Sequence, residues 1–167
     1  CSNIGDNQVI LSATDKAGNS ASAPAVVKVL GVIPAPAIEV AGLTGNAITL
    51  GYGPQTATLN ATDGAPASTS NFAWTPGDGL SASNGASVQF VPTAAGTFAF
   101  KVRAVNQNGC SAEATVSVPV VDARCETDKV LLCKTTGSST NPSTQLCVSP
   151  DAVPAHLRSG AALGACT

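Results

Sequence analysis

The run from Trp74 to Gly79, Trp-Thr-Pro-Gly-Asp-Gly, restricts the fold of this chain more than any other stretch. Proline presets φ, glycine permits positive φ, and aspartate hydrogen-bonds its own backbone, so a tight turn directly follows a large aromatic side chain. Downstream, Gly96–Val105 alternates between two faces, as β-strands do. The pattern predicts strands joined by short turns, with Trp74 in the core and with Asp78 and Gly79 shaping the turn.

Strand signals recur at the spacing of a β-sandwich along residues 34–121. Only 4% of residues are aromatic and 11% are charged, while 16 glycines and 11 prolines favour short strands over long helices. Trp74, Phe72, Phe90 and Phe98 hold nearly all the aromatic mass, and we expect most of them in one core. The expected strands are Ala37–Ala41, Ala47–Leu50, Thr56–Ala61, Asn71–Thr75, Ser87–Val91, Gly96–Val105 and Ala112–Val120.

Three motifs in this region occur in a fixed order: Trp-x-x-Gly-Asp-Gly, Gly-Thr-Phe-x-Phe-x-Val and Asn-x-x-Gly-Cys. Together they resemble PKD-type and related immunoglobulin-like β-sandwich modules over residues 35–121. Two departures stand out, because Thr75-Pro76 replaces the usual aromatic-plus-glycine approach and Cys110 has no partner cysteine near residues 45–55. The resemblance implies a spacer or binding module, in which Asp78 is a turn residue and not an acid catalyst.

Residues 1–33 are interpreted as a partial β-repeat. Gln8–Ala13 and Ala23–Leu30 flank a turn at Asp15–Asn19, which predicts a hairpin, and the prolines of residues 31–36 form a stiff boundary behind it. The pattern Cys-Ser-Asn-x-Gly-x-Asn-x-Val-x-Leu-x-Ala-x-Asp-x-x-Gly-Asn resembles the closing half of immunoglobulin-like repeats in very large bacterial surface proteins of the adhesin or gliding type. Either the chain is then a fragment, or strands from elsewhere complete the repeat. A free-standing hairpin and a lipoprotein cysteine are the alternatives.

An even number of cysteines in a chain with one histidine indicates disulfides, hence a secreted or cell-surface location. The absence of an initiator methionine indicates a processed product or a fragment. The six candidates are Cys1, Cys110, Cys125, Cys133, Cys147 and Cys166. We expect the pairs Cys133–Cys147 and Cys125–Cys166, with Cys1 and Cys110 joined to each other or left single by truncation. Four local cysteines permit three connectivities.

Residues 122–167 are expected to form a small disulfide-stapled α+β module, because so short a unit buries too little surface alone. Lys129–Cys133 and Thr144–Val148 read as strands, and Ser149-Pro150-Asp151 as a helix start, with Gly160 ending the helix.

This segment also resembles a secreted bacterial domain family that reads Cys-His-x-x-Gly-Ser near its start and His-Leu-x-His-Gly-Asp near its end. The matching positions here are Lys134, His156, Ser159 and Ala161, so only one histidine remains. One imidazole cannot hold a divalent ion without further ligands, and a metal site is therefore not expected.

The chain lacks the motifs of common active sites. A Ser-His-Asp triad would have to use His156, and neither a Gly-x-Ser-x-Gly elbow, a phosphate-binding glycine loop nor a Cys-x-x-Cys pair is present. A net charge of −2 without a basic cluster argues against nucleic-acid binding, and prolines and charges interrupt the most apolar stretch, so membrane insertion is not expected. Four acids beside Gly or Asn could bind calcium at a sandwich edge but are better explained as surface turn residues: Asp6, Asp15, Asp63 and Asp78.

These observations predict an all-β extracellular protein: a partial repeat at 1–33, an immunoglobulin/PKD-like sandwich at 34–121 and a small α+β module at 122–167. The expected function is a non-enzymatic structural and adhesion segment without a cofactor, in contact with neighbouring domains or subunits. One alternative is a fibre subunit that adds strands through residues 1–31. Another is an accessory module that binds surface polysaccharide for a secreted enzyme.

Overall fold

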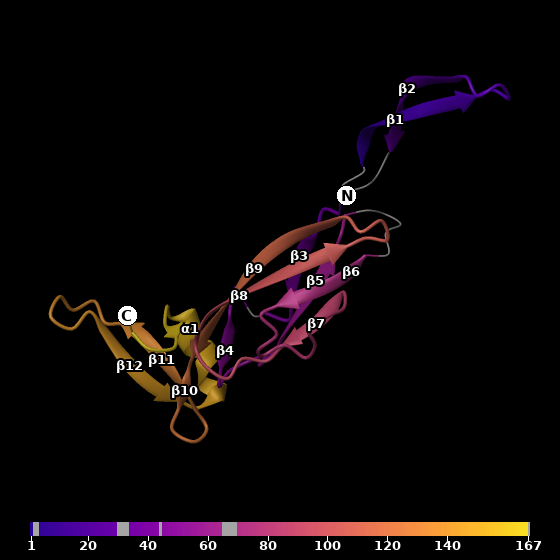
Figure 1. The fold of residues 1–167 in the computed structure, drawn as a ribbon. Helices are drawn as coiled ribbons and strands as arrows, with labels where there is room; N and C mark the ends of the chain where they lie inside the picture. Colours follow the sequence, from indigo (N-terminus) through magenta and orange to yellow (C-terminus); the bar gives the residue numbers. More distant parts are fainter. Residues whose placement is uncertain (2–3, 30–33, 44, 65–69, 167) are drawn as a thin grey trace.

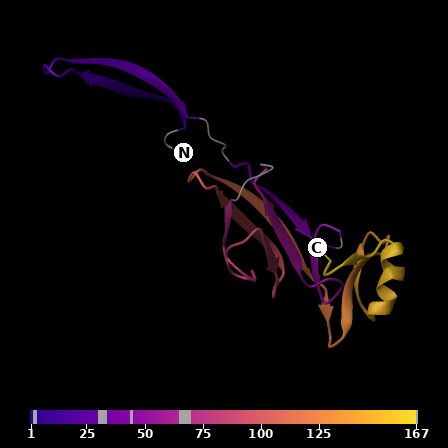
Figure 2. The same ribbon diagram turned by 90° about the vertical axis from the view of Figure 1, so that its right-hand side faces the viewer.

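The computed structural model describes residues 1, 4–29, 34–43, 45–64 and 70–166, which form an elongated, mostly β molecule (Figure 1). A hairpin lies at one end, two facing sheets in the middle and a small sheet with a helix at the other, and a second view shows the same succession (Figure 2). The strands are β1 (Gly5–Thr14), β2 (Ser20–Val29), β3 (Ala37–Ala41), β4 (Ile48–Leu50), β5 (Ala57–Thr62), β6 (Asn71–Thr75), β7 (Ser87–Phe90), β8 (Gly96–Val105), β9 (Ser111–Asp122), β10 (Arg124–Cys125), β11 (Lys129–Thr135), β12 (Ser143–Val148) and β13 (Ala162–Leu163).

The middle part, the sandwich, consists of two sheets that share one apolar core. One sheet has the order β3-β5-β7 and the other β4-β9-β8-β6, and all neighbours are antiparallel except β4, which runs parallel to β9. Because side chains alternate along a strand, every second residue of each sheet faces this core. Its buried members are Ile48, Leu50, Ala57, Leu59, Ala61, Trp74, Val88, Phe90, Phe100, Val102, Val118 and Val120.

The expected strand positions agree closely with the structure. The bounds of β3, β6 and β8 are those expected, and most other expected strands shift by one or two residues at an end, as strand ends usually do. In the N-terminal hairpin β1 is longer at its start than expected, and Asp6 lies within it instead of in a turn. Leu30 and residues 31–33 of the expected boundary lie outside the described residues.

Residues 76–86, here called the strap, connect β6 to β7 and hydrogen-bond to one outer strand of each sheet, β6 and β7. At β6, Trp74 N–H donates to Ser83 O at 2.8 Å, and Gly85 N–H donates back to a β6 carbonyl at 3.1 Å. At β7, Ser81 N–H donates to Gln89 O at 2.8 Å. Of the four outer strands of the two sheets, β6 and β7 therefore have partners on their outer sides. Unpaired edges are what otherwise invite pairing with another chain.

The C-terminal part is built on a sheet of order β10-β11-β12, and β13 pairs with β11. A 3-10 turn, η1 (Pro150–Ala152), leads into α1 (Val153–Arg158). The α-helix thus begins after the expected start at Pro150, because the first turn is of the tighter 3-10 type. This part has its own core, made of Ala123, Val130, Leu132, Val153 and Ala161.

Candidate functional site

All six cysteines are paired, and the three disulfides connect or staple the parts of the molecule. Cys1, before β1, is joined to Cys110, in the turn between β8 and β9, with the two Cα atoms 4.6 Å apart. This bridge attaches the hairpin to the sandwich. The expectation that the cysteines form disulfides is confirmed, as is the first of the two alternatives for Cys1 and Cys110.

The expected pairing of the other four cysteines is wrong. The bridges are Cys125–Cys147 and Cys133–Cys166, with Cα separations of 5.9 and 4.9 Å. The register explains the difference, because β11 places Cys133 opposite Gln145 and Cys147 opposite Leu131, so these two cysteines do not face each other. Cys133, in β11, is instead paired with Ala162 of β13, and this pairing brings Cys133 close to Cys166.

The four acids considered for calcium lie in separate places. Asp6 is in β1, Asp15 at the hairpin tip, Asp63 after β5 and Asp78 in the strap. Asp15 uses its carboxylate locally, since Oδ1 accepts the N–H groups two and four residues further on at 2.8 and 2.9 Å. Hydrogen bonds from Asn19, side chain first, hold the pKa of Asp15 below its usual value. This carboxylate is a turn cap.

Among the described residues, no three His, Cys, Asp or Glu side chains gather as metal ligands would. His156 lies in the last turn of α1, and its carbonyl accepts the Ser159 hydroxyl at 2.8 Å and the Ala161 N–H at 3.1 Å. The C-terminal positions that match the histidine motif therefore form a helix end. In the described part of the chain, no helix has the length and apolar character needed to cross a membrane.

The turn after Trp74 begins the strap, which bonds to β6 and β7. Trp74 is 3% exposed, and its Nε1–H donates to the carbonyl of Gly85 in the strap at 2.9 Å. Gly79 has φ +77°, and a Cβ there would lie 3.1 Å from the Phe90 ring, so glycine is needed twice over at this position. Asp78 beside it is exposed. These residues hold the strap against the core.

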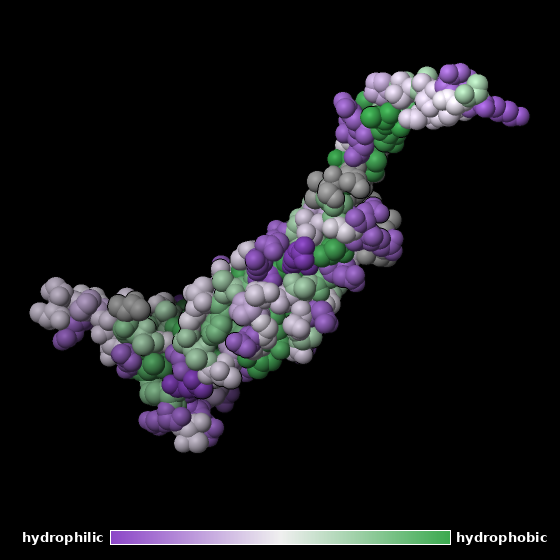
Figure 3. Space-filling view, in the orientation of Figure 1, coloured by the Kyte–Doolittle hydropathy of each residue, from purple (hydrophilic) through white to green (hydrophobic). Residues whose placement is uncertain are grey.

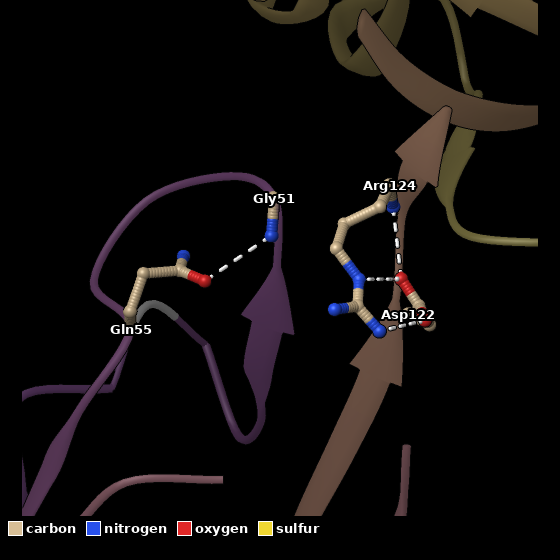
Figure 4. Close-up of polar contacts among 4 residues, drawn as sticks. All are labelled: Gly51, Gln55, Asp122 and Arg124. Carbon is tan, nitrogen blue, oxygen red and sulfur yellow. Dashed lines mark hydrogen bonds and ion pairs between the residues drawn. The ribbon is translucent and has the colours of Figure 1, made fainter. Parts of the chain in front are cut away.

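The sandwich meets the C-terminal part at a close contact (Figure 4). Asp122 ends β9, and its Oδ1 accepts the backbone N–H of Arg124 at 3.0 Å and the Nε–H of the same residue at 2.9 Å. A Cβ at Gly51, after β4, would lie 2.8 Å from Arg124 Cγ. Gln55 Oε1 accepts the Gly51 N–H at 3.1 Å and so holds this loop in place. The loop after β4 and the start of β10 are therefore in close contact.

The Asp122 carboxylate is expected to become protonated only at a lower pH than an ordinary aspartate. Hydrogen bonds from Arg124, the side chain first, lower the pKa of Asp122 from 3.8 to about 2. Because the folded pKa is the lower one, this stabilisation is complete above pH 3.8 and is lost as the pH falls through about 2. Both side chains are more than a third exposed, which limits it to below about 1 kcal/mol. Carboxyl NMR titration should show the low pKa in the wild type and a return toward 3.8 in Arg124→Gln.

Gly164→Ala is expected to destabilise the same junction. A Cβ at Gly164 would lie 2.6 Å from Val121 Cγ1, so the new methyl group cannot be accommodated without movement, at a cost of about 1–3 kcal/mol. Gly160→Ala is the matched control: its φ of +88° is close to the +92° of Gly164, but nothing lies within 4 Å of its Cβ position. Both variants strain the backbone to a similar degree, so the difference between their losses of thermal stability measures the effect of the contact with Val121. Equal losses of stability would show that the contact does not matter.

Exposed apolar side chains are concentrated in the N-terminal hairpin, and Figure 3 shows hydrophobic residues gathered where it approaches the sandwich. Of the seven large hydrophobic residues that are exposed in the described chain, six lie in β1 and β2. The sequence indicated the hairpin but not which face it leaves open. The six are Val9, Ile10, Leu11, Val26, Val27 and Val29.

Comparison of the sequence with models of known protein families and with curated proteins finds no match.

Proposed function

We propose that the chain is a non-enzymatic extracellular segment of a bacterial surface protein, in which an immunoglobulin/PKD-type sandwich serves as a stalk and adhesion module. The strand arrangement supports this interpretation. Strands β3–β9 divide into sheets of three and four that share one core, and a tryptophan on β6 is buried between them. Immunoglobulin-like domains combine two such sheets with a buried tryptophan.

The observation that carries the proposal is the distribution of the disulfides. One joins the hairpin to the sandwich and two lie within the C-terminal part, so each part of the elongated molecule holds at least one disulfide-bonded cysteine (Figure 1). Disulfides persist in oxidising compartments and are rare in the cytosol. Cross-links that secure successive parts suit a segment that must carry load outside the cell.

The test compares chain exported to an oxidising compartment with chain made in a reducing one. Exported protein should contain no reactive thiols, resist protease and, when coated on beads, retain the beads on bacterial surfaces under flow. Exported protein that has been reduced and alkylated should lose both protease resistance and retention. Equal protease resistance of the cytosolic protein with six free thiols would overturn the extracellular interpretation, and equal retention of uncoated beads would overturn adhesion.

The polysaccharide-binding alternative gains no support from the aromatic residues. Stacking on sugar rings needs exposed aromatic faces, whereas Trp74, Phe90 and Phe100 are at most 3% exposed. The remaining rings are partly buried and pack against the two cores: Phe72, Phe98 and Tyr52.

The fibre alternative requires an open sheet on a neighbouring copy to receive residues 1–31. Within the described residues, the strap already occupies the outer edges of β6 and β7. A folded copy of the sandwich therefore offers no open edge on that side, although the hairpin itself remains exposed.

A further inference from the structure

The N-terminal hairpin has one apolar face without a charged side chain. The pairing of β1 with β2 puts alternate residues on the same side, and this side carries Gly5 and Asn7 besides apolar residues. Val9, Leu11, Val27 and Val29 on it are between 38% and 66% exposed. An apolar face of this kind on a two-stranded sheet marks an interaction surface. Its apolar members are Val9, Leu11, Ala13, Ala21, Ala23, Ala25, Val27 and Val29.

The hairpin turn is repeated within the same chain, between β8 and β9. Asp15 Oδ1 accepts the N–H groups two and four residues further on at 2.8 and 2.9 Å, and Asn106 Oδ1 does the same at 3.0 and 2.9 Å. Each of these two residues also donates its own N–H to the carbonyl four residues on, at 2.9 Å. A glycine with positive φ stands three residues after each, Gly18 at +87° and Gly109 at +73°.

The match extends along both pairs of strands. Gly5 pairs with Val29, and Gly96 pairs with Val120. When Gly5 is aligned with Gly96, every residue pair between β1 and β2 corresponds to a residue pair between β8 and β9. The apolar face keeps its composition under this alignment. The positions corresponding to the apolar members above are Phe100, Val102, Ala104, Ala112, Ala114, Val116, Val118 and Val120.

The second hairpin shows what covers such a face. Its residues Phe100, Val102, Val118 and Val120 are at most 4% exposed, because the sheet β3-β5-β7 packs on them. Its edges are also occupied, β8 by antiparallel β6 and β9 by parallel β4. Five strands thus complete the second hairpin, whereas within the described residues β1 and β2 pair only with each other.

We propose that the β1–β2 hairpin docks onto the open half of another β-sandwich, which supplies a three-stranded apolar sheet against its face, an antiparallel strand beside β1 and a parallel strand beside the end of β2. Pro24 is compatible with this arrangement. It corresponds to Thr115, whereas β4 pairs with β9 only from Val120 to Asp122, so the missing proline N–H falls outside the paired stretch.

The closed fold of the sandwich favours this partner over a second copy of the chain. The sandwich of a folded copy already holds its own closing hairpin, and its edge strands β6 and β7 are bonded to the strap. The hairpin, moreover, is attached at its base by Cys1–Cys110, which leaves the apolar face accessible along its length. This inference goes beyond a role as a stalk, since it names what the exposed end binds.

The test supplies the hairpin with the five strands that cover the β8–β9 hairpin in the same chain. A second copy of residues 34–95, which holds β3–β7, is placed ahead of Cys1 in the otherwise full chain. Ala95 directly precedes Gly96 in the sandwich, and in the extended chain residues 1–4 lengthen the connection to the corresponding Gly5. Amide hydrogen exchange is then followed in β1 and β2. Docking should slow exchange of these amides by about a hundredfold relative to the unextended chain, as for a change from a fraying element to a folded core.

Paired variants make the result specific. Leu11→Lys places a charge on the apolar face and should abolish the protection, whereas Ser12→Lys, one residue on and facing the other side, should retain it. Val9→Phe restores the ring that Phe100 provides in the sandwich and should increase protection only in the extended chain.

Two outcomes would overturn the proposal. One is unchanged exchange in the extended chain even with Asn7→Phe and Val9→Phe together, which restore both core rings of β8. The other is protection that appears in the unextended chain as its concentration rises, with sedimentation as a dimer, because a second copy would then be the occupant.

Discussion

Trp74→Ala is expected to lower the free energy of unfolding of the sandwich by about 3–5 kcal/mol, the usual range for removing a buried large aromatic side chain. Trp74 is 3% exposed and packs within a single core shared by both sheets. A domain of this size is stable by only about 5–15 kcal/mol, so the variant should unfold at much lower urea concentration. Far-UV circular dichroism is the suitable probe, since Trp74 is the one tryptophan of the chain.

Trp74→Phe separates the two roles of this side chain. It keeps an aromatic ring in the core but removes the Nε1–H that donates to Gly85 O, which should cost about 1–3 kcal/mol. Hydrogen exchange at Ser81, whose N–H bonds to Gln89 O in β7, should then increase as the strap loosens. Val91→Ala, at a 47% exposed position, is the control and should stay within about 0.5 kcal/mol of the wild type. A Trp74→Ala loss no larger than that of Val91→Ala would contradict the central place of Trp74.

The strands could be read from the sequence because their side chains alternate. Gly96–Val105 is the clearest example, where every second residue is apolar and enters the core, and the structure gives β8 the same bounds. The turn at Asp15 could be predicted as well, since aspartate hydrogen-bonds to the backbone that follows it.

Pairings between distant segments could not be read in the same way. β10 and β13 contain two residues each and exist only because β11 lies beside them. The Cys133–Cys166 and Cys125–Cys147 bridges depend on the register of β11 with β12, which four closely spaced cysteines leave undetermined. The bonds of the strap to β6 and β7 could not be predicted for a related reason. Most of them join backbone groups, and backbone groups are the same in every sequence.

The exposed face of the hairpin was only half visible. The sequence predicted a hairpin, but which residues share a face depends on the pairing register of β1 with β2, which the structure shows. The two ends of the chain therefore differ. One end carries an exposed apolar face, while the other packs its own small core.

Removing Cys133–Cys166 as the Cys133→Ala/Cys166→Ala variant is expected to unfold much of the C-terminal part, at a cost of about 2–5 kcal/mol. That part has a core of only five buried residues, too few to hold so short a unit without a cross-link. The bridge spans 33 residues, and opening it returns that loop entropy to the unfolded chain. Limited proteolysis with mass spectrometry should find new cleavage sites in β11 and β12.

The Cys1→Ala/Cys110→Ala variant provides the matched comparison. It removes a bridge with a separation of 109 residues, yet this bridge joins the hairpin to the sandwich and does not touch the C-terminal core. Hydrogen exchange in β11 should therefore remain as in the wild type, while β1 and β2 lose the attachment at their base. If β11 were exposed in this variant but protected without Cys133–Cys166, the C-terminal part would depend on the sandwich and not on its own disulfides.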